Sequence, residues 1–372
     1  MGIFSWGKTS SSVGLALETN TFRLVQLKAT SGTPMLTHYS SIDVPAGAMV
    51  EDELVDIDTA AKTLGRLWKN AGISTPKVVV GLANQKVVVR LIALPYMEKH
   101  ELKSAIHYQA QDFIPIPVEE AIIDFDIVGE FTNENEERMI EMLLVAAQRD
   151  MINNLVVALN KAGLKPKVID VSSLALVRAL NGHSSVLDEA EGEAAALVNI
   201  GSGVTNIVVE EQGKPRFTRV APLAGNNFTQ RIAENLNISF GEAEELKTRI
   251  GLPPLEGEQE EISGIEPKQV KVVQDLLMKE LNKFVGEIRR SIDYYLTQRP
   301  GVKSIQNITL SGNGAKISNL LAHLQQGLQV KMELGHPLQK VKLAPKLSKE
   351  TIISEELGMA ICLGLALRGL EE

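Results

Sequence analysis

The chain has 372 residues, 44% of them hydrophobic and 23% charged, and a formal net charge of −8. This composition is typical of a soluble globular protein, and the length predicts two or three domains with cores of their own. The negative charge argues against a general nucleic-acid-binding protein, which needs a basic face, and the single cysteine, Cys362, excludes an internal disulfide.

Neither end of the chain has the pattern of a membrane segment. The first twelve residues contain too few apolar side chains for the core of a signal peptide. The most apolar run, residues 357–370, includes three glycines and an arginine, and it is shorter than the about 20 apolar residues of a spanning helix. We therefore expect a cytoplasmic protein that associates with a membrane only through a partner or a short anchor.

An approximate internal repeat organises the chain. Residues 13–27 (VGLALETNTFRLVQL) and 197–211 (LVNIGSGVTNIVVEE) each read as an apolar strand, a small polar turn and a second apolar strand. Each unit then reaches a Gly-x-Pro corner, at Gly32 and Gly213, and another strand follows. Two unrelated hairpins would share some of this pattern, but the repetition favours a duplicated α/β fold with a cleft between its halves.

The residues between the repeats have a different organisation. Periodicity predicts two strands, a helix that the prolines of FIPIP end, a hairpin, a second helix and a last strand. In chain order these elements are expected at residues 77–82, 87–94, 97–113, 121–148, 149–163 and 165–171. This βαββαβ-like succession is large enough for a subdomain of its own.

The second half of the chain is mainly helical after Leu223. Amphipathic spacing predicts two helices, then one long helix or a pair of helices, and then a strand, a glycine turn and a helix. These elements are expected at residues 226–239, 240–251, 268–300 and 304–328. A final apolar helix ends near Arg368.

Several of these segments together resemble one family. They are the two repeat units, the FIPIP element followed by DFDIV, and the stretches IDVSSLAL, LSGNGAKISNL and LGMAICLGLALRGL. Nearly end to end, the chain resembles PilM, the family of FtsA-related, actin-like cytoplasmic proteins of type IV pilus assembly. FIPIP with DFDIV is the most specific part of this resemblance, because glycine turns occur in many folds.

The resemblance implies an actin-like ATPase fold, with two duplicated α/β domains around a cleft and an inserted FtsA/PilM-type subdomain. We place the first domain at residues 1–75 and 171–193 and the insertion at 76–170. The second domain then covers residues 194–372, with a mostly helical subdomain at about 224–300.

The resemblance also implies partners. In the family, the N-terminal cytoplasmic tail of the inner-membrane protein PilN docks in a groove beside the insertion, and PilO links the complex to the periplasm. The protein would thus be recruited to the inner face of the inner membrane, with pilus motor ATPases, the platform protein and further copies of itself as other possible contacts. An apolar, proline-rich strip is our candidate groove, although each of its residues could instead belong to the core. The strip comprises Leu94, Pro95, Phe113, Ile114, Pro115, Ile116 and Pro117.

Two turns are candidates for binding the phosphates of ATP or ADP, with or without Mg²⁺. Backbone N–H groups at Gly201, Ser202 and Gly203 can approach a phosphate closely because glycine has no side chain, and the Thr205 hydroxyl adds a donor. In the first turn, Thr19 and Asn20 are the expected donors. The neighbouring Glu18 would repel a polyphosphate unless it faces solvent or holds Mg²⁺.

The adenosine side of the cleft has two further candidates. Glu244 and Lys247 lie three residues apart and share a helix face; relatives use these positions on the ribose and base, and the alternative is an exposed ion pair. A third turn precedes a helix and would lie beside the nucleotide, or it is an ordinary strand-to-helix connection. Its candidate residues are Gly312, Asn313, Gly314 and Lys316.

We expect no catalytic residue and no metal site built by the protein alone. Active relatives place carboxylates around the metal and the attacking water, where this chain has Ala16 and Asn199, and an amide cannot act as a base. Hydrolysis should be very slow or absent. The alternatives are an FtsA-like cell-division adaptor, against which the acidic ending LRGLEE counts, and an active ATPase or kinase of the same fold.

Overall fold

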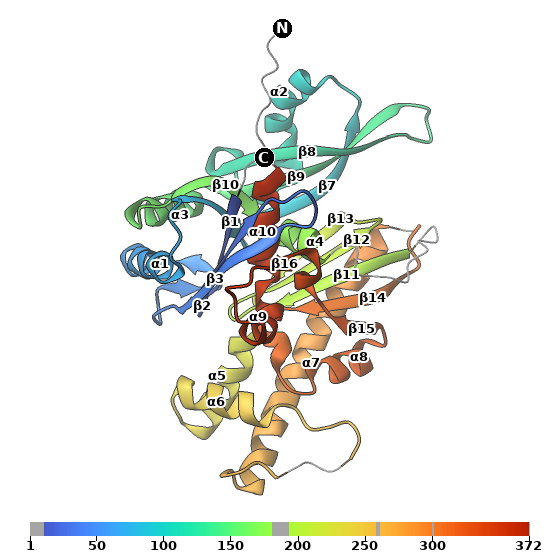
Figure 1. The fold of residues 1–372 in the computed structure, drawn as a ribbon. Helices are drawn as coiled ribbons and strands as arrows, with labels where there is room; N and C mark the ends of the chain where they lie inside the picture. The colour runs from blue at the N-terminus through green and yellow to red at the C-terminus, as the bar shows by residue number, and fades with distance from the viewer. Residues whose placement is uncertain (1–10, 181–192, 258–260, 300, 372) are drawn as a thin grey trace.

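The structure is a computed structural model that describes residues 11–180, 193–257, 261–299 and 301–371. Two mixed sheets form the centres of two α/β halves, a three-stranded sheet projects at one end, and helices α5, α6 and α7 extend at the other (Figure 1). Among the described residues, no helix is long and apolar enough to cross a membrane.

The first half is built on a six-stranded sheet in the order β10-β6-β1-β2-β3-β16. Strands β1, β2 and β3 form an antiparallel meander, and β6 and β10 continue the sheet in parallel with β1. The strands are β1 (Ser11–Leu17), β2 (Thr21–Lys28), β3 (Met35–Asp43), β6 (Lys77–Leu82), β10 (Lys165–Val171) and β16 (Lys342–Leu343).

The second half repeats this plan. Its sheet has the order β13-β12-β11-β14-β15, with an antiparallel meander followed by two parallel strands. The strands are β11 (Glu193–Ile200), β12 (Thr205–Glu211), β13 (Lys214–Ala221), β14 (Ser304–Ser311) and β15 (Lys331–Leu334). In both halves the five shared strands, numbered along the chain, lie across the sheet in the order third, second, first, fourth and fifth. The predicted duplication of an α/β unit is therefore confirmed.

The inserted sheet is smaller than we expected. It contains only β7 (Val87–Pro95), β9 (Arg138–Gln148) and β8 (Ala121–Thr132), in that order. Strands β6 and β10, which we assigned to an insertion at 76–170, instead pair with each other, and β6 pairs with β1 in the first sheet. Their strand pattern was correctly predicted, but periodicity does not show which sheet a strand joins.

The end of the chain also departs from the expected second domain, 194–372. Strand β16 pairs with β3 of the first sheet, and the last helix packs on β1. The predicted helical subdomain at about 224–300 agrees with three consecutive helices. Residues 181–192 of the expected boundary, and residues 1–10 before β1, lie outside the described residues.

Ten α-helices are formed by the described residues, several with clear start signals. Asp56 accepts hydrogen bonds from the first turn of α1, and Ser239 and Glu242 form a capping box at α6. The helices are α1 (Ile57–Ala71), α2 (Lys99–Gln109), α3 (Arg149–Lys161), α4 (Ser172–Leu180), α5 (Gly225–Leu236), α6 (Phe240–Ile250), α7 (Pro267–Gln298), α8 (Leu320–Leu328), α9 (Lys349–Glu355) and α10 (Ala360–Glu371).

Helix α10 lies at the centre of the molecule and packs on both α4 and β1 (Figure 1). The contacts are made by backbone: a Cβ on Gly364 would lie 1.9 Å from the Ala175 oxygen, and one on Gly14 would lie 2.0 Å from the Cys362 oxygen. Only glycine fits at these two positions. Cys362 is fully buried there, as expected of a packing residue.

Candidate functional site

A cavity of about 470 Å³ lies between the two halves, and its size is typical of a small-ligand pocket. The first turn, the second turn, helices α5 and α6 and the third turn all contribute to its wall. Eight of the twelve predicted nucleotide-binding residues line it. They are Asn20, Gly201, Ser202, Glu244, Lys247, Asn313, Gly314 and Lys316.

The first two turns, 182 residues apart in sequence, touch directly. The Asn20 N–H donates to the Ser202 Oγ at 3.1 Å, and the carboxamides of Asn20 and Asn226 exchange hydrogen bonds of 2.7 and 3.0 Å. A Cβ on Gly203 would lie 2.1 Å from the Thr19 Oγ1. The glycine therefore allows the two turns to approach each other.

The remaining four predicted residues do not line this cavity. Thr205 is fully buried and donates its hydroxyl hydrogen to the Leu223 oxygen at 2.7 Å, so our prediction of a free donor for phosphate was wrong. Gly312 has a φ of +86° and packs against Ile200. Thr19 and Gly203 line a separate cavity of about 310 Å³ beside the hairpin of β4 (Met49–Val50) and β5 (Glu53–Leu54).

Glu18 does not face solvent, contrary to one of the two alternatives we considered. Its carboxylate lies 3.1 Å from the guanidinium of Arg23, and the two side chains are 5% and 3% exposed. Burial lowers the pKa of Arg23, but the charge of Glu18 and other neighbours outweighs burial, and the pKa is raised. Arg23 also lines the cavity, and its Nε has no hydrogen-bond partner among the described residues.

Sequence reasoning missed Arg23. A signal was available, because an arginine inside the apolar run of β2 has to be paired when it is buried. In the sheet Arg23 lies opposite Ala16 of β1. A buried cation with an unused donor, together with the polar turns, makes the cavity suitable for an anionic ligand.

Glu244 and Lys247 lie on one helix face, as their spacing predicted. The Lys247 ammonium is 2.7 Å from the Glu244 carboxylate, 2.8 Å from the Thr229 hydroxyl and 3.3 Å from the Gly225 oxygen. The lysine side chain is 7% exposed and that of Glu244 44%. Burial lowers the pKa of Lys247, and the charge of Glu244 opposes this shift. The pair is thus a half-buried part of the cavity wall.

The two positions with lost carboxylates are both inside the protein. Ala16 packs in the apolar cluster between the first sheet and α10, and Asn199 accepts a hydrogen bond of 3.0 Å from the Ser311 hydroxyl. Among the described residues, no group of three or more His, Cys, Asp or Glu side chains could hold a metal ion.

The predicted partner strip is only partly open. Leu94 and Ile114 are 6% and 8% exposed and belong to the core beneath α2, so the strip is interrupted at these two residues. Phe113 is 36% exposed, Ile116 is half-buried, and Pro95, Pro115 and Pro117 are exposed.

A network of charged side chains that we did not predict joins the inserted sheet to the second half. Arg216 pairs with Glu141 of β9, and Arg299 at the end of α7 pairs with Glu211 at 3.0 Å. Burial raises the pKa of Glu211, but hydrogen bonds from Arg299 and Tyr295 outweigh burial, and the pKa is lowered. The network borders a second cavity, of about 320 Å³.

Comparison with known proteins assigns the family. The model of the family described as "Type IV pilus assembly protein PilM" matches residues 14–370. The chain belongs to the PilM family. A chain of the solved PilM-PilN type IV pilus biogenesis complex is 26% identical to it, with a TM-score of 0.81 over 98% of this chain and 100% of that one.

More distant similarities agree with the fold. Cell division protein FtsA of Bacillus subtilis is 23% identical over 79% of this PilM-family chain and 72% of its own length. FtsA of Escherichia coli (strain K12) is 31% identical over 52% of this chain and 48% of its own length. MreB5 of Spiroplasma citri, solved with AMPPNP, has a TM-score of 0.53 at 13% identity, over 97% of this chain and 96% of that one. The fold is therefore actin-like, as the resemblance implied.

Proposed function

We propose that this PilM-family protein is a scaffold of type IV pilus assembly that binds the N-terminal tail of PilN. The observation that carries the proposal is the TM-score of 0.81, over almost the whole chain, with a chain from a PilM-PilN complex. Binding of PilN would recruit the protein to the inner face of the inner membrane and connect it indirectly to PilO. Contacts with motor ATPases, the platform protein or other copies of the chain belong to the same proposal.

The strip around Phe113 is our proposed binding surface for the tail. It follows α2 and borders the core of the inserted sheet. Tyr96, next to β7, and Tyr108, on α2, are also exposed, at 36% and 84%. Leu94 and Ile114 support it from the core beneath. A cluster of exposed aromatic and proline side chains over a firm core is a suitable platform for an extended apolar peptide.

We also propose that the cavity between the halves binds ADP or ATP, with Mg²⁺ held chiefly by the nucleotide. Arg23, Asn20 and Ser202 would face the phosphates, and Lys247 and Glu244 the adenosine. At the two positions where the resemblance implies carboxylates around the metal and the attacking water, this chain has none. Ala16 is aliphatic, and the Asn199 amide bonds Ser311. Turnover should therefore be very slow or absent.

A calorimetric titration of the full chain with a synthetic PilN N-terminal peptide tests the scaffold. We expect saturable binding of one peptide per chain, and no heat with a peptide of the same composition in scrambled order. The absence of binding to the authentic peptide, with the protein folded, would refute the proposal.

A further inference from the structure

The hairpin formed by β4 (Met49–Val50) and β5 (Glu53–Leu54) has an unusual turn. Its two central residues, Glu51 and Asp52, have φ values of +48° and +59°. Two-residue hairpins of this kind favour Asn and Gly, because other side chains are strained at positive φ. A strained residue persists only when its surroundings hold it there. At Asp52 those surroundings are the first turn of the nucleotide cleft.

Asp52 and Thr19 are joined by three hydrogen bonds. The Thr19 N–H and hydroxyl donate to the Asp52 Oδ1 at 2.6 and 2.7 Å, and the Asp52 N–H donates to the Thr19 Oγ1 at 2.9 Å. The same carboxylate oxygen would lie 3.0 Å from a Cβ on Gly203 of the second turn. An acidic oxygen thus lies where the two turns meet.

This position is electrostatically unfavourable for a carboxylate. Burial and the neighbouring Glu18 raise the pKa of Asp52 to about 8, although the hydrogen bonds from Thr19 act in the opposite direction. No cation is paired with Asp52 among the described ion pairs, while Arg23 is paired with Glu18. The carboxylate is held by backbone geometry and by the donors of Thr19.

We propose that Asp52 is an internal competitor for the phosphate of a bound nucleotide. Its side chain occupies the Thr19 N–H and hydroxyl, donors of the first turn that lie next to Asn20 at the cavity wall and that an anion would otherwise use. A nucleoside diphosphate or triphosphate has to displace it. The inference rests on the proposed nucleotide site and adds the residue that keeps its affinity low.

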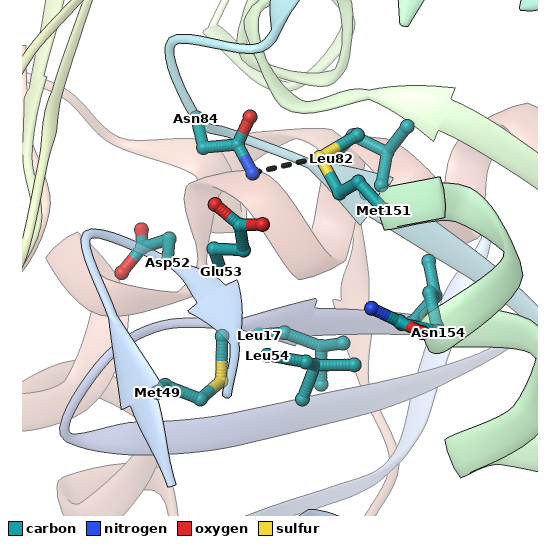
Figure 2. A pocket seen from close by; sticks show the side chains of 11 residues that line it. Leu17, Met49, Asp52, Glu53, Leu54, Leu82, Asn84, Met151 and Asn154 are labelled. Atoms are coloured by element: carbon teal, nitrogen blue, oxygen red, sulfur yellow. Dashed lines mark hydrogen bonds between the residues drawn. The ribbon is translucent and has the colours of Figure 1, made fainter. Parts of the chain in front are cut away.

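The other side of the hairpin makes the inference testable, because it is anchored independently of Thr19. The Glu53 carboxylate lies 2.6 Å from Lys86, and Gln85 donates to Glu51 at 3.3 Å. Figure 2 shows Asp52 and Glu53 beside Met49 and Leu54 at a small cavity of about 20 Å³ that Asn84 and Met151 close from the other side. Removing the Asp52 side chain should leave the hairpin in place.

The test is calorimetric titration of the full chain with Mg-ADP and, separately, with adenosine. Asp52→Gly removes the competing side chain and suits a positive φ, and Asp52→Asn keeps an acceptor oxygen for the Thr19 donors. We expect the Kd for ADP to fall at least about tenfold in Asp52→Gly, equivalent to about 1.4 kcal/mol, and less in Asp52→Asn. Adenosine, which has no phosphate, should bind both variants as it binds the wild type.

Asp124→Asn, which removes an exposed carboxylate on β8, is the matched control and should leave the Kd unchanged. Equal ADP affinity in wild type and Asp52→Gly would overturn the inference and leave the nucleotide site standing. A gain for adenosine as large as for ADP would also overturn it, because the effect would then be a general loosening. Absence of ADP binding in all proteins would overturn both the inference and the nucleotide site, but not the binding of PilN.

Discussion

The guanidinium of Arg23 lies 3.1 Å from the carboxylate of Glu18, and both side chains are almost completely buried in the wall of the cleft. Burying a charge without a partner costs free energy, so each member of this pair offsets the cost of burying the other. Glu18 therefore does more than add negative charge near the phosphates. It also neutralises the arginine that an anionic ligand would meet.

Replacing Arg23 should show this dependence. Arg23→Met leaves Glu18 buried and unpaired, and we expect the free energy of unfolding to fall by about 3–5 kcal/mol in urea denaturation. The double variant Glu18→Gln/Arg23→Met should recover much of this loss, because no unpaired charge remains. Lys161→Met, which breaks an exposed ion pair with Asp58, serves as control and should have no measurable effect. Equal losses in the single and double variants would contradict the pairing.

The pH dependence of stability should carry a contribution from Asp52. Burial and Glu18 raise the pKa of Asp52 from 3.8 to about 8. A carboxyl with a raised folded-state pKa contributes stability below its unfolded pKa and loses it as pH rises through the folded one. Between about pH 5 and about pH 9, the wild type should therefore lose stability relative to Asp52→Asn. The difference between their free energies of unfolding should change by more than about 1.4 kcal/mol, the value of one pKa unit.

Asp56→Asn is the control for this pH effect. Hydrogen bonds from Thr59 lower the pKa of Asp56, so its carboxylate does not titrate in the same range. The difference from the wild type should stay constant from about pH 5 to about pH 9. A parallel pH profile for Asp52→Asn and the wild type would show that Asp52 is not buried beside Glu18 in solution.

Lys247 should contribute to nucleotide affinity. Lys247→Met keeps the buried stem of the side chain but removes the ammonium that lies between Glu244, Thr229 and the cavity. We expect the Kd for ADP to rise at least about tenfold, with little change in thermal unfolding. Lys283→Met, which breaks an ion pair of the same spacing with Glu280 on α7, should leave the Kd unchanged.

The surface that binds the PilN tail can be located by truncating aromatic side chains. Phe113→Ala should weaken peptide binding by about 1–3 kcal/mol in calorimetry, the usual cost at an aromatic anchor. Phe131→Ala is the comparison: it is also exposed on the inserted sheet, but it lines the cavity next to Arg216 and Tyr295. Loss of affinity in Phe131→Ala alone would place the tail in that cavity instead.

Gly364 should be intolerant of any side chain. Gly364→Ala places a Cβ 1.9 Å from the Ala175 oxygen of α4, and we expect a loss of at least about 1–3 kcal/mol in the free energy of unfolding. Gly65→Ala in α1 is the matched control. Its Cβ would meet nothing within 4 Å, so it should stabilise the protein by about 0.5–1 kcal/mol.

Local pattern predicted many of the elements of this fold. The repeated strand-turn-strand units became the two meanders, and the alternation around the turn at residues 133–137 became the β8–β9 hairpin. The pattern did not show partners across the sheet. Residues 77–82 and 165–171 read as strands in an inserted region, yet they complete the first sheet, because parallel pairing depends on contacts distant in sequence.

The candidate site shows the same difference between local features, which the sequence reveals, and contacts between distant residues, which it does not. Glycine turns and an i,i+3 pair are local features, and most of their residues do line the cleft. Arg23, Asp52 and Asn226 were missed because their roles depend on burial and on neighbours from other elements. Thr205 was misjudged for a related reason: a hydroxyl near a glycine turn suggests a free donor, but its hydrogen bond goes to Leu223.

The contact between α4 and α10 limits how the molecule can change shape. One apolar cluster contains residues of both helices together with Val25 of β2 and Val208 of β12, so the two halves share a core rather than meeting at a surface. Separating the two halves at this contact would expose that core to water. A change in the opening of the cleft therefore has to leave this shared core intact.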